Sequence, residues 1–142
     1  MAAAKVAPQV ETLGRPLVMV VEDEVLIRMA VAAALRNVGL HALEARDADE
    51  ALTIIHAGII PDVLFTDVRM PGSMDGLKLA ALLESMFPDM HIIVSSAYIG
   101  RTDLKMSVNF IAKPLDPAIV ARIVKKVLNR PRPSTDRVPD EK

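Results

Sequence analysis

The chain has 142 residues, which suits one domain with a core of its own. Its composition, 51% hydrophobic and 25% charged, is typical of a globular protein rather than a disordered one. A net charge of −1 gives no sign of nucleic-acid binding, and no apolar stretch approaches the roughly 20 residues of a membrane helix. Cysteine is absent, so disulfides and thiol chemistry are excluded, and we expect a protein of the reducing cytoplasm.

Strand and helix patterns alternate along most of the chain, within an expected domain at 16–129. An Ala-rich arm at 1–15 precedes this domain, and a Pro-rich, charged tail at 130–142 follows it and is expected to be disordered. In chain order the predicted elements are a strand at 17–21, a helix at 25–38, a strand at 40–45, a helix from 47 to 57, a strand at 63–66, a helix at 77–87, a strand at 91–95, a strand at 108–112 and a helix from 116 to 129.

Several residues mark where these helices start and stop. Asp47 and Glu50 have the spacing of a capping box, and Gly39 suits the position just after a helix. Asp116 and Pro117 suit the N-cap and first position of the last helix. The segment 98–107 has no convincing apolar stripe, so we expect the fourth helix to be short or irregular.

Strands separated by helices favour parallel pairing with right-handed crossovers. Near-continuous apolar strands indicate a sheet covered on both faces. The predicted fold is therefore α/β: a flavodoxin-like (βα)5 three-layer sandwich with a parallel five-stranded sheet of order 2-1-3-4-5.

Chemically active side chains follow four of the predicted strands. Glu22 and Asp23 follow the first strand and Asp67 the third, while Ser96 and Lys113 end the fourth and fifth. In the predicted order the first and third strands are neighbours, so the three carboxylates converge. Two charges about 5 Å apart repel by roughly 3 kcal/mol at an effective dielectric of about 20, and Mg²⁺ would remove that repulsion. An aspartate in such a site can accept a phosphoryl group.

These residues resemble those of a response-regulator receiver domain of two-component signalling. The resemblance covers 17–129 and depends on five pieces in order, which are Val20-Val21-Glu22-Asp23-Glu24, Asp67, Met70-Pro71-Gly72 with Asp75-Gly76, Ser96-Ala97 and Lys113-Pro114. Each piece lies at or just after a strand end, and no single piece would suffice.

The resemblance implies a role for each matching residue. Asp67 would be the phospho-acceptor, Asp23 a direct Mg²⁺ ligand, Glu22 a ligand acting mostly through metal-bound water, and Arg69 a ligand through its backbone carbonyl. The further implied roles are a switch hydroxyl at Ser96, a phosphoryl-contacting amine at Lys113, a cis peptide at Lys113-Pro114 and an aromatic switch at Phe110. Phe110 could equally be ordinary core, and Tyr98 either a mobile aromatic bordering the site or a surface residue.

Two departures from the family pattern stand out. Ser73 lengthens the loop after the third strand by one residue, and the interval from Ser96 to Lys113 is several residues short. Both features, with Val94-Ser95-Ser96-Ala97-Tyr98, resemble an alphaproteobacterial receiver subgroup with a Phe-Ala-Thr-Gly-type motif. These departures put in question the family's usual output face, which the fourth helix, the fifth strand and the fifth helix form.

The predicted function is a single-domain response regulator, phosphorylated on Asp67 by a sensor histidine kinase or phosphotransfer protein. It would catalyse only its own phosphorylation and dephosphorylation, and would signal to an unidentified protein partner without a DNA-binding output domain. Activation, inhibition, relay and phosphate-sink roles stay open, as does homodimerisation through the last helix. One alternative is a pseudo-receiver scaffold. Another is an aspartyl-phosphate phosphatase, which would need a second Asp where Arg69 stands.

Overall fold

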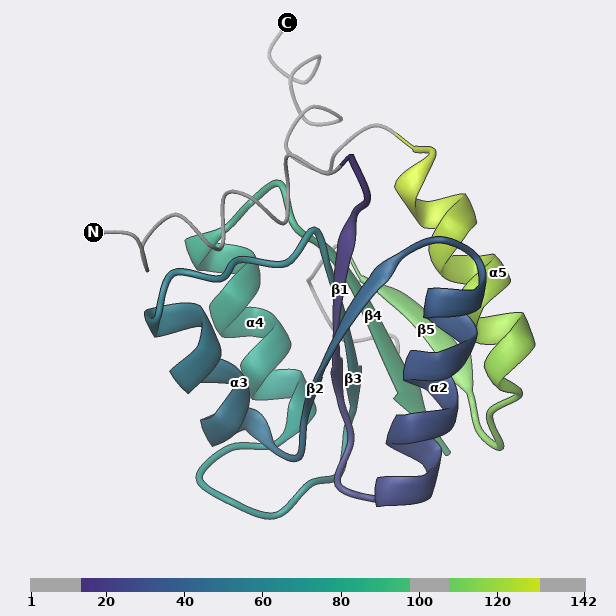
Figure 1. The fold of residues 1–142 in the computed structure, drawn as a ribbon. Helices are drawn as coiled ribbons and strands as arrows, with labels where there is room; N and C mark the ends of the chain where they lie inside the picture. The colour runs from purple at the N-terminus through teal and green to yellow at the C-terminus, as the bar shows by residue number, and fades with distance from the viewer. Residues whose placement is uncertain (1–13, 98–107, 131–142) are drawn as a thin grey trace, which may run out of the picture.

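The computed structural model describes residues 14–97 and 108–130, and there it contains one parallel five-stranded sheet in the order β2-β1-β3-β4-β5. The predicted flavodoxin-like fold and strand order are therefore confirmed (Figure 1). In chain order the described elements are β1 (Leu17–Val21), α2 (Val25–Asn37), β2 (His41–Ala45), α3 (Ala48–His56), β3 (Val63–Asp67), α4 (Gly76–Met86), β4 (His91–Ser96), β5 (Asn109–Ala112) and α5 (Pro117–Leu128).

Some expectations fall on residues outside the described ranges. The short or irregular fourth helix and Tyr98 belong to 98–107, and the predicted arm and tail belong mostly to 1–13 and 131–142. In the part of the chain that the structure describes, no helix is long and apolar enough to cross a membrane.

The predicted elements agree with the observed ones to within about one residue at most ends. Asp47 caps α3, because its Oδ1 accepts a hydrogen bond from the backbone N–H of Glu50 at 2.9 Å. Asp116 caps α5 by accepting from Ala118 N at 3.0 Å, with Pro117 at the first turn. Gly39 ends α2 with a φ of +90°, a conformation that a side chain would strain.

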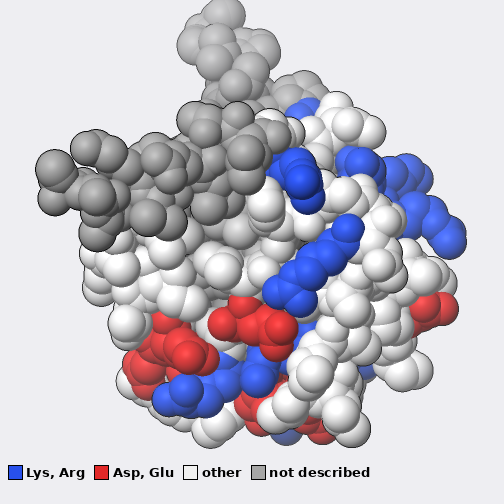
Figure 2. All heavy atoms as spheres, viewed as in Figure 1, with Lys and Arg blue, Asp and Glu red and all other residues white. Residues whose placement is uncertain are grey.

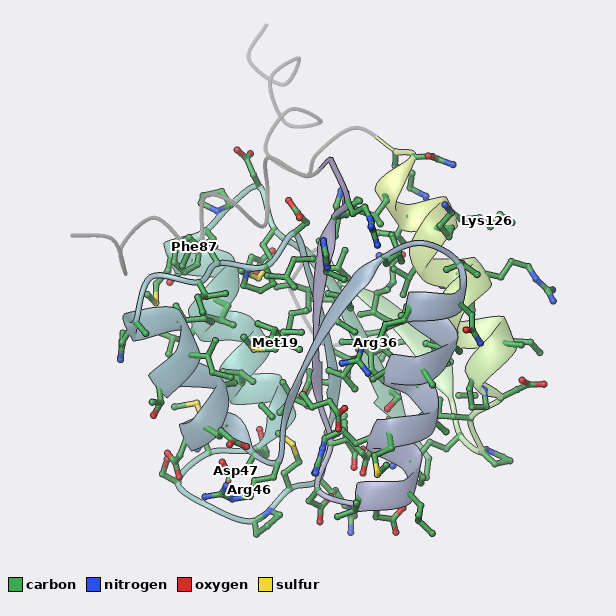
Figure 3. The ribbon with its side chains drawn as sticks, viewed as in Figure 1. Met19, Arg36, Arg46, Asp47, Phe87 and Lys126 are labelled. Carbon is green, nitrogen blue, oxygen red and sulfur yellow. The ribbon has the colours of Figure 1, made fainter. Side chains whose placement is uncertain are left out.

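Two apolar layers sandwich the sheet, and alternation along each strand decides which layer a side chain enters. Val18, Phe65 and Ile93 pack with α2 and α5, whereas Met19 and Leu64 pack with α3 and α4. Met19 lies between the sheet and the α3–α4 layer in Figure 3. The strands β1, β3 and β4 are buried along their whole length, so the carboxyl ends of three rigid neighbours fix the positions of the residues that follow.

Candidate functional site

Three carboxylates meet at the carboxyl ends of β1 and β3. Asp67 is the last residue of β3, while Glu22 and Asp23 directly follow β1, its neighbour in the sheet. One carboxylate oxygen from each of the three lies within 4.8 Å of the other two. Asp67 and Glu22 are buried, and Asp23 is exposed at the mouth of the group. Among the described residues, Figure 2 shows Asp and Glu in the lower half of the visible face, the half toward which β1 runs in Figure 1.

Lys113 brings a positive charge to this group from the far edge of the sheet. Its Nζ lies 3.0 Å from Asp67 Oδ1 and 3.9 Å from Glu22 Oε1. Burial by itself lowers the pKa of the Lys113 ammonium, but the hydrogen bond and charge of Asp67, with the charges of Glu22 and Glu24, raise the pKa overall. Lys113 therefore stays protonated and neutralises one of the three carboxylates.

The carboxyl group of Glu22 has a strongly raised pKa. Burial raises the pKa of its carboxyl from the usual 4.5 to about 7. A hydrogen bond from the backbone of Glu24 opposes the shift, the charge of Asp67 adds to it, Lys113 opposes it and Asp23 adds to it, in decreasing order of size. The carboxyl of Glu22 is therefore partly protonated near neutral pH until more positive charge arrives.

The backbone and a nearby arginine hold Glu22 in place. The Oε2 atom of Glu22 accepts from Glu24 N at 3.1 Å, and Arg28 donates from Nη1 to the Glu22 carbonyl at 3.0 Å. Arg28 is fixed in turn by Glu44, 3.1 Å from its Nε. The remaining oxygen, Oε1, is buried and has no hydrogen-bond partner. An anchored carboxylate with one buried oxygen that accepts no hydrogen bond suits a ligand that is a cation.

The donor set fits a hard divalent cation. Mg²⁺ binds carboxylate oxygens and retains several waters, and the exposed position of Asp23 leaves room for those waters. The acidic group of Glu22, Asp23 and Asp67 could therefore hold a metal, with its charge repulsion as the driving force.

Gly76 lies directly against the backbone of Asp67. The Gly76 N–H donates to the Val68 carbonyl at 2.8 Å, and a Cβ at position 76 would overlap the carbonyl oxygen of Asp67. Thr66 Oγ1 donates to the same carbonyl at 2.9 Å. The start of α4 is thus packed directly against the backbone of Asp67, which only a glycine allows.

The additional loop residue Ser73 has a defined place in the structure. Its Oγ donates to Asp49 Oδ1 at 2.5 Å and its N–H to Asp49 Oδ2 at 3.4 Å, so the loop is tied to the first turn of α3. Gly72 permits this approach with a φ of +110°. Arg69 lies exposed in the same loop, and its predicted role as a carbonyl ligand stays a prediction.

The remaining predicted residues lie along β4 and β5. Ser96 is the last residue of β4 and is buried, and its carbonyl accepts from Lys113 N at 3.0 Å. Strand alternation places its side chain on the α3–α4 face of the sheet, the face opposite to that of Asp67. Phe110 is half-buried in β5 and packs against the α3–α4 core. The Lys113–Pro114 peptide bond is cis, as the resemblance implied.

Sequence reasoning missed three contributors to this site. Arg28, which binds the Glu22 carbonyl, resembles any polar residue of an amphipathic helix. Gly76 was noted only as part of a motif, without its contact to Asp67. Ser95 stands inside an apolar strand and is fully buried beside Asp67, although its Oγ has no hydrogen-bond partner. A serine interrupting an apolar run was the available signal for the last of these.

The fold and the site together define a receiver domain, and comparisons with known proteins agree. The family model for the response regulator receiver domain matches residues 18–127, so the chain belongs to this family of two-component signalling proteins. The chain is 31% identical over 123 residues to the DNA-binding transcriptional regulator NtrC of Salmonella typhimurium, and 32% over 135 residues to the regulatory protein PhoB of Pseudomonas aeruginosa. These matches cover 81% and 87% of the chain, but only 25% of NtrC and 56% of PhoB.

Solved structures show the same similarity. The receiver domain of the hybrid histidine kinase CckA superposes with a TM-score of 0.68 at 33% identity, covering 80% of this chain and 99% of that one. The response regulator TrrA of Thermotoga maritima, solved with Mg²⁺ and BeF, gives a TM-score of 0.70 at 29% identity, covering 79% and 98%. Each match covers about four fifths of this chain and nearly all of the other.

Proposed function

We propose that the chain, through a domain at 16–129, accepts a phosphoryl group on Asp67 from a sensor histidine kinase or phosphotransfer protein in the cytoplasm. The observation that carries this proposal is the contact of 3.0 Å between Lys113 Nζ and Asp67 Oδ1, inside a group of three carboxylates. A single ammonium poised on one buried carboxylate distinguishes Asp67 from its acidic neighbours as the reacting group.

The chemistry requires positioning and charge neutralisation more than proton transfer. A carboxylate oxygen of Asp67 would form a bond to phosphorus, while the bond from phosphorus to the donor nitrogen breaks and its electron pair leaves with the donor. The product is an acyl phosphate on Asp67. Lys113, already bound to the Asp67 carboxylate, would follow the phosphoryl oxygens and offset their charge.

The metal in this proposal is Mg²⁺. Glu22, Asp23 and Asp67 would hold it with the backbone carbonyl of Arg69, and when bound it supplies charge neutralisation to the phosphoryl oxygens. The raised pKa of Glu22 and its buried Oε1, which accepts no hydrogen bond, support a cation at this position.

Ser96 is the proposed switch residue. Its side chain starts on the opposite face of the sheet from Asp67, so binding a phosphoryl oxygen requires it to move. That movement would shift the balance between two conformations of β4 and the segment after it, and we propose Phe110 and Tyr98 as the aromatic residues that respond. The signal would then pass to a protein partner, since no DNA-binding module lies within the proposed domain; relay, sink and dimeric modes stay open.

The test is phosphate incorporation from a cognate kinase or from acetyl phosphate with Mg²⁺. Asp67→Asn is expected to abolish the acid-stable, hydroxylamine-sensitive label that marks an acyl phosphate. Asp116→Asn is the matched control, because Asn also caps a helix and α5 should stay intact. Persistence of the label in Asp67→Asn would refute the assignment. Amide NMR with beryllofluoride and Mg²⁺ separates the scaffold alternative, which predicts no shifts near Asp67 and Ser96.

A further inference from the structure

Ser95 places a second hydroxyl beside the acceptor carboxylate, distinct from the one on Ser96. We propose that Ser95 is a positioning residue of the phosphoryl site: after rotation of its side chain, its Oγ–H donates to the carboxyl group of Asp67 during hydrolysis and shortens the lifetime of the acyl phosphate. This inference rests on the proposed function and adds to it a residue that governs how quickly the phosphoryl group is lost.

The sheet register places Ser95 directly beside Asp67. The two residues are Cα partners in the parallel pairing of β3 and β4, and the Val68 N–H donates to the Ser95 carbonyl at 3.1 Å. Two residues earlier, Phe65 and Ile93 are partners and both enter the α2–α5 core. Alternation with a period of two therefore sends the side chains of Asp67 and Ser95 to that same face. Paired strands lie about 4.8 Å apart, which makes the two side chains immediate neighbours.

The hydroxyl of Ser95 is available. The residue is fully buried, and its Oγ has no hydrogen-bond partner. A buried hydroxyl without a partner is destabilising, so its retention among apolar residues requires an explanation. Rotation about χ1 moves the Oγ between three staggered positions without disturbing the backbone. Asp67 is the Cα partner of Ser95 on that face, so its carboxylate is the acceptor that such a rotation would serve.

Lys113 supports the same placement. It follows β5, yet its Nζ contacts Asp67 on β3, and β4 lies between those two strands. Ile111, two residues before Lys113, is the Cα partner of Ser95. The lysine side chain therefore crosses β4 on the face that Ser95 occupies. A small side chain at position 95 leaves room for this crossing.

The direction of the effect follows from charge. In hydrolysis a water oxygen forms a bond to phosphorus, the bond from phosphorus to the Asp67 oxygen breaks, and its electron pair returns to the carboxylate while the water proton leaves with phosphate. The carboxyl group gains negative charge along this path. A hydrogen bond to a charged acceptor is stronger than one to a neutral carbonyl, so the Ser95 hydroxyl favours the transition state over the acyl phosphate.

The experiment measures the decay of the acyl phosphate after labelling with acetyl phosphate and Mg²⁺ and removal of the donor. Ser95→Ala is expected to slow the decay about fivefold, as when a hydrogen bond that strengthens with charge is lost. Ser95→Cys, similar in size but a weak donor, should slow it as well. Ser95→Thr retains the hydroxyl and should decay at a rate close to that of the wild type.

Several outcomes would overturn the inference. Equal decay rates for wild type and Ser95→Ala would remove the role of the hydroxyl, and a slow Ser95→Thr would assign the effect to packing instead. Ser85→Ala is the control, because Ser85 lies on α4, exposed, with its Oγ bonded to the Leu82 carbonyl. If the wild type itself takes no label, the proposed function has failed; if it is labelled and Ser95→Ala decays normally, only the role of Ser95 has failed.

Discussion

The buried carboxyl of Glu22 leads to a prediction about stability in the absence of metal. Replacing it by Gln in Glu22→Gln keeps the shape of the side chain and removes its ability to ionise. The folded protein holds the pKa of Glu22 at about 7, against 4.5 for an unperturbed glutamate. Between those two values the folded state binds more protons than the unfolded state, so unfolding becomes easier as pH rises.

The size of the effect follows from the shift. The difference in pKa corresponds to about 3 kcal/mol of destabilisation, complete above pH 7 and absent below pH 4.5. Glu22 is 1% exposed, so solvent screening reduces this figure little. We therefore expect Glu22→Gln to be more stable than wild type by up to about 3 kcal/mol at pH 8, and by less than about 1 kcal/mol at pH 4.5.

Urea unfolding in the presence of EDTA at pH 4.5 and pH 8 measures the two differences. The matched control is Glu24→Gln, the same change two residues away at an exposed position, which should give no comparable gain in stability at pH 8. Added Mg²⁺ at pH 8 should stabilise the wild type more than the Gln variant, because binding to the folded state raises its stability. A Gln variant no more stable than wild type at pH 8, or one whose advantage is equal at both pH values, would contradict the argument.

Two further predictions concern the supports of the site. Gly76→Ala should lower the free energy of unfolding by about 3 kcal/mol or more, because the new Cβ overlaps the carbonyl of Asp67. Gly58→Ala, in open space at a φ of +102°, should cost only about 1 kcal/mol; similar losses in urea unfolding would discount the contact. Ser73→Ala should cost at most about 1 kcal/mol and speed amide exchange in the loop tied to Asp49. Unchanged exchange there would show that the tie is unimportant.

The fold could be predicted because its signals are local. The apolar runs that became β1, β3 and β4 are buried along their whole length, and the helix caps Asp47 and Asp116 work within three residues of themselves. The convergence of Glu22 and Asp67 followed from strand order alone. These features depend only on residues close together in the chain or on the order of the strands, and both can be inferred from the sequence.

The contacts that complete the site depend on register and could not be predicted in the same way. Ser73 binds Asp49, which lies 24 residues earlier in the chain, and no local sequence pattern at either residue predicts this contact. The nearness of Ser95 to Asp67 requires the exact pairing of β3 with β4. A slip of one residue would have turned Ser95 to the other face of the sheet and brought Ser96 to the side of Asp67.

Buried polar atoms without hydrogen-bond partners lower the stability of the fold. In the described residues three such side-chain atoms occur, on Glu22, Ser95 and His41. The first two flank Asp67 from the neighbouring strands β1 and β4, at the carboxyl end of the sheet. The cation and the phosphoryl transfer proposed for this site would give each of them a partner there. His41 lies at the opposite end of β2, and nothing in the structure explains its bare Nε2. Under the proposed function, stability lost at Glu22 and Ser95 would be recovered on metal binding or phosphoryl transfer, and those two positions would be sensitive to the state of Asp67.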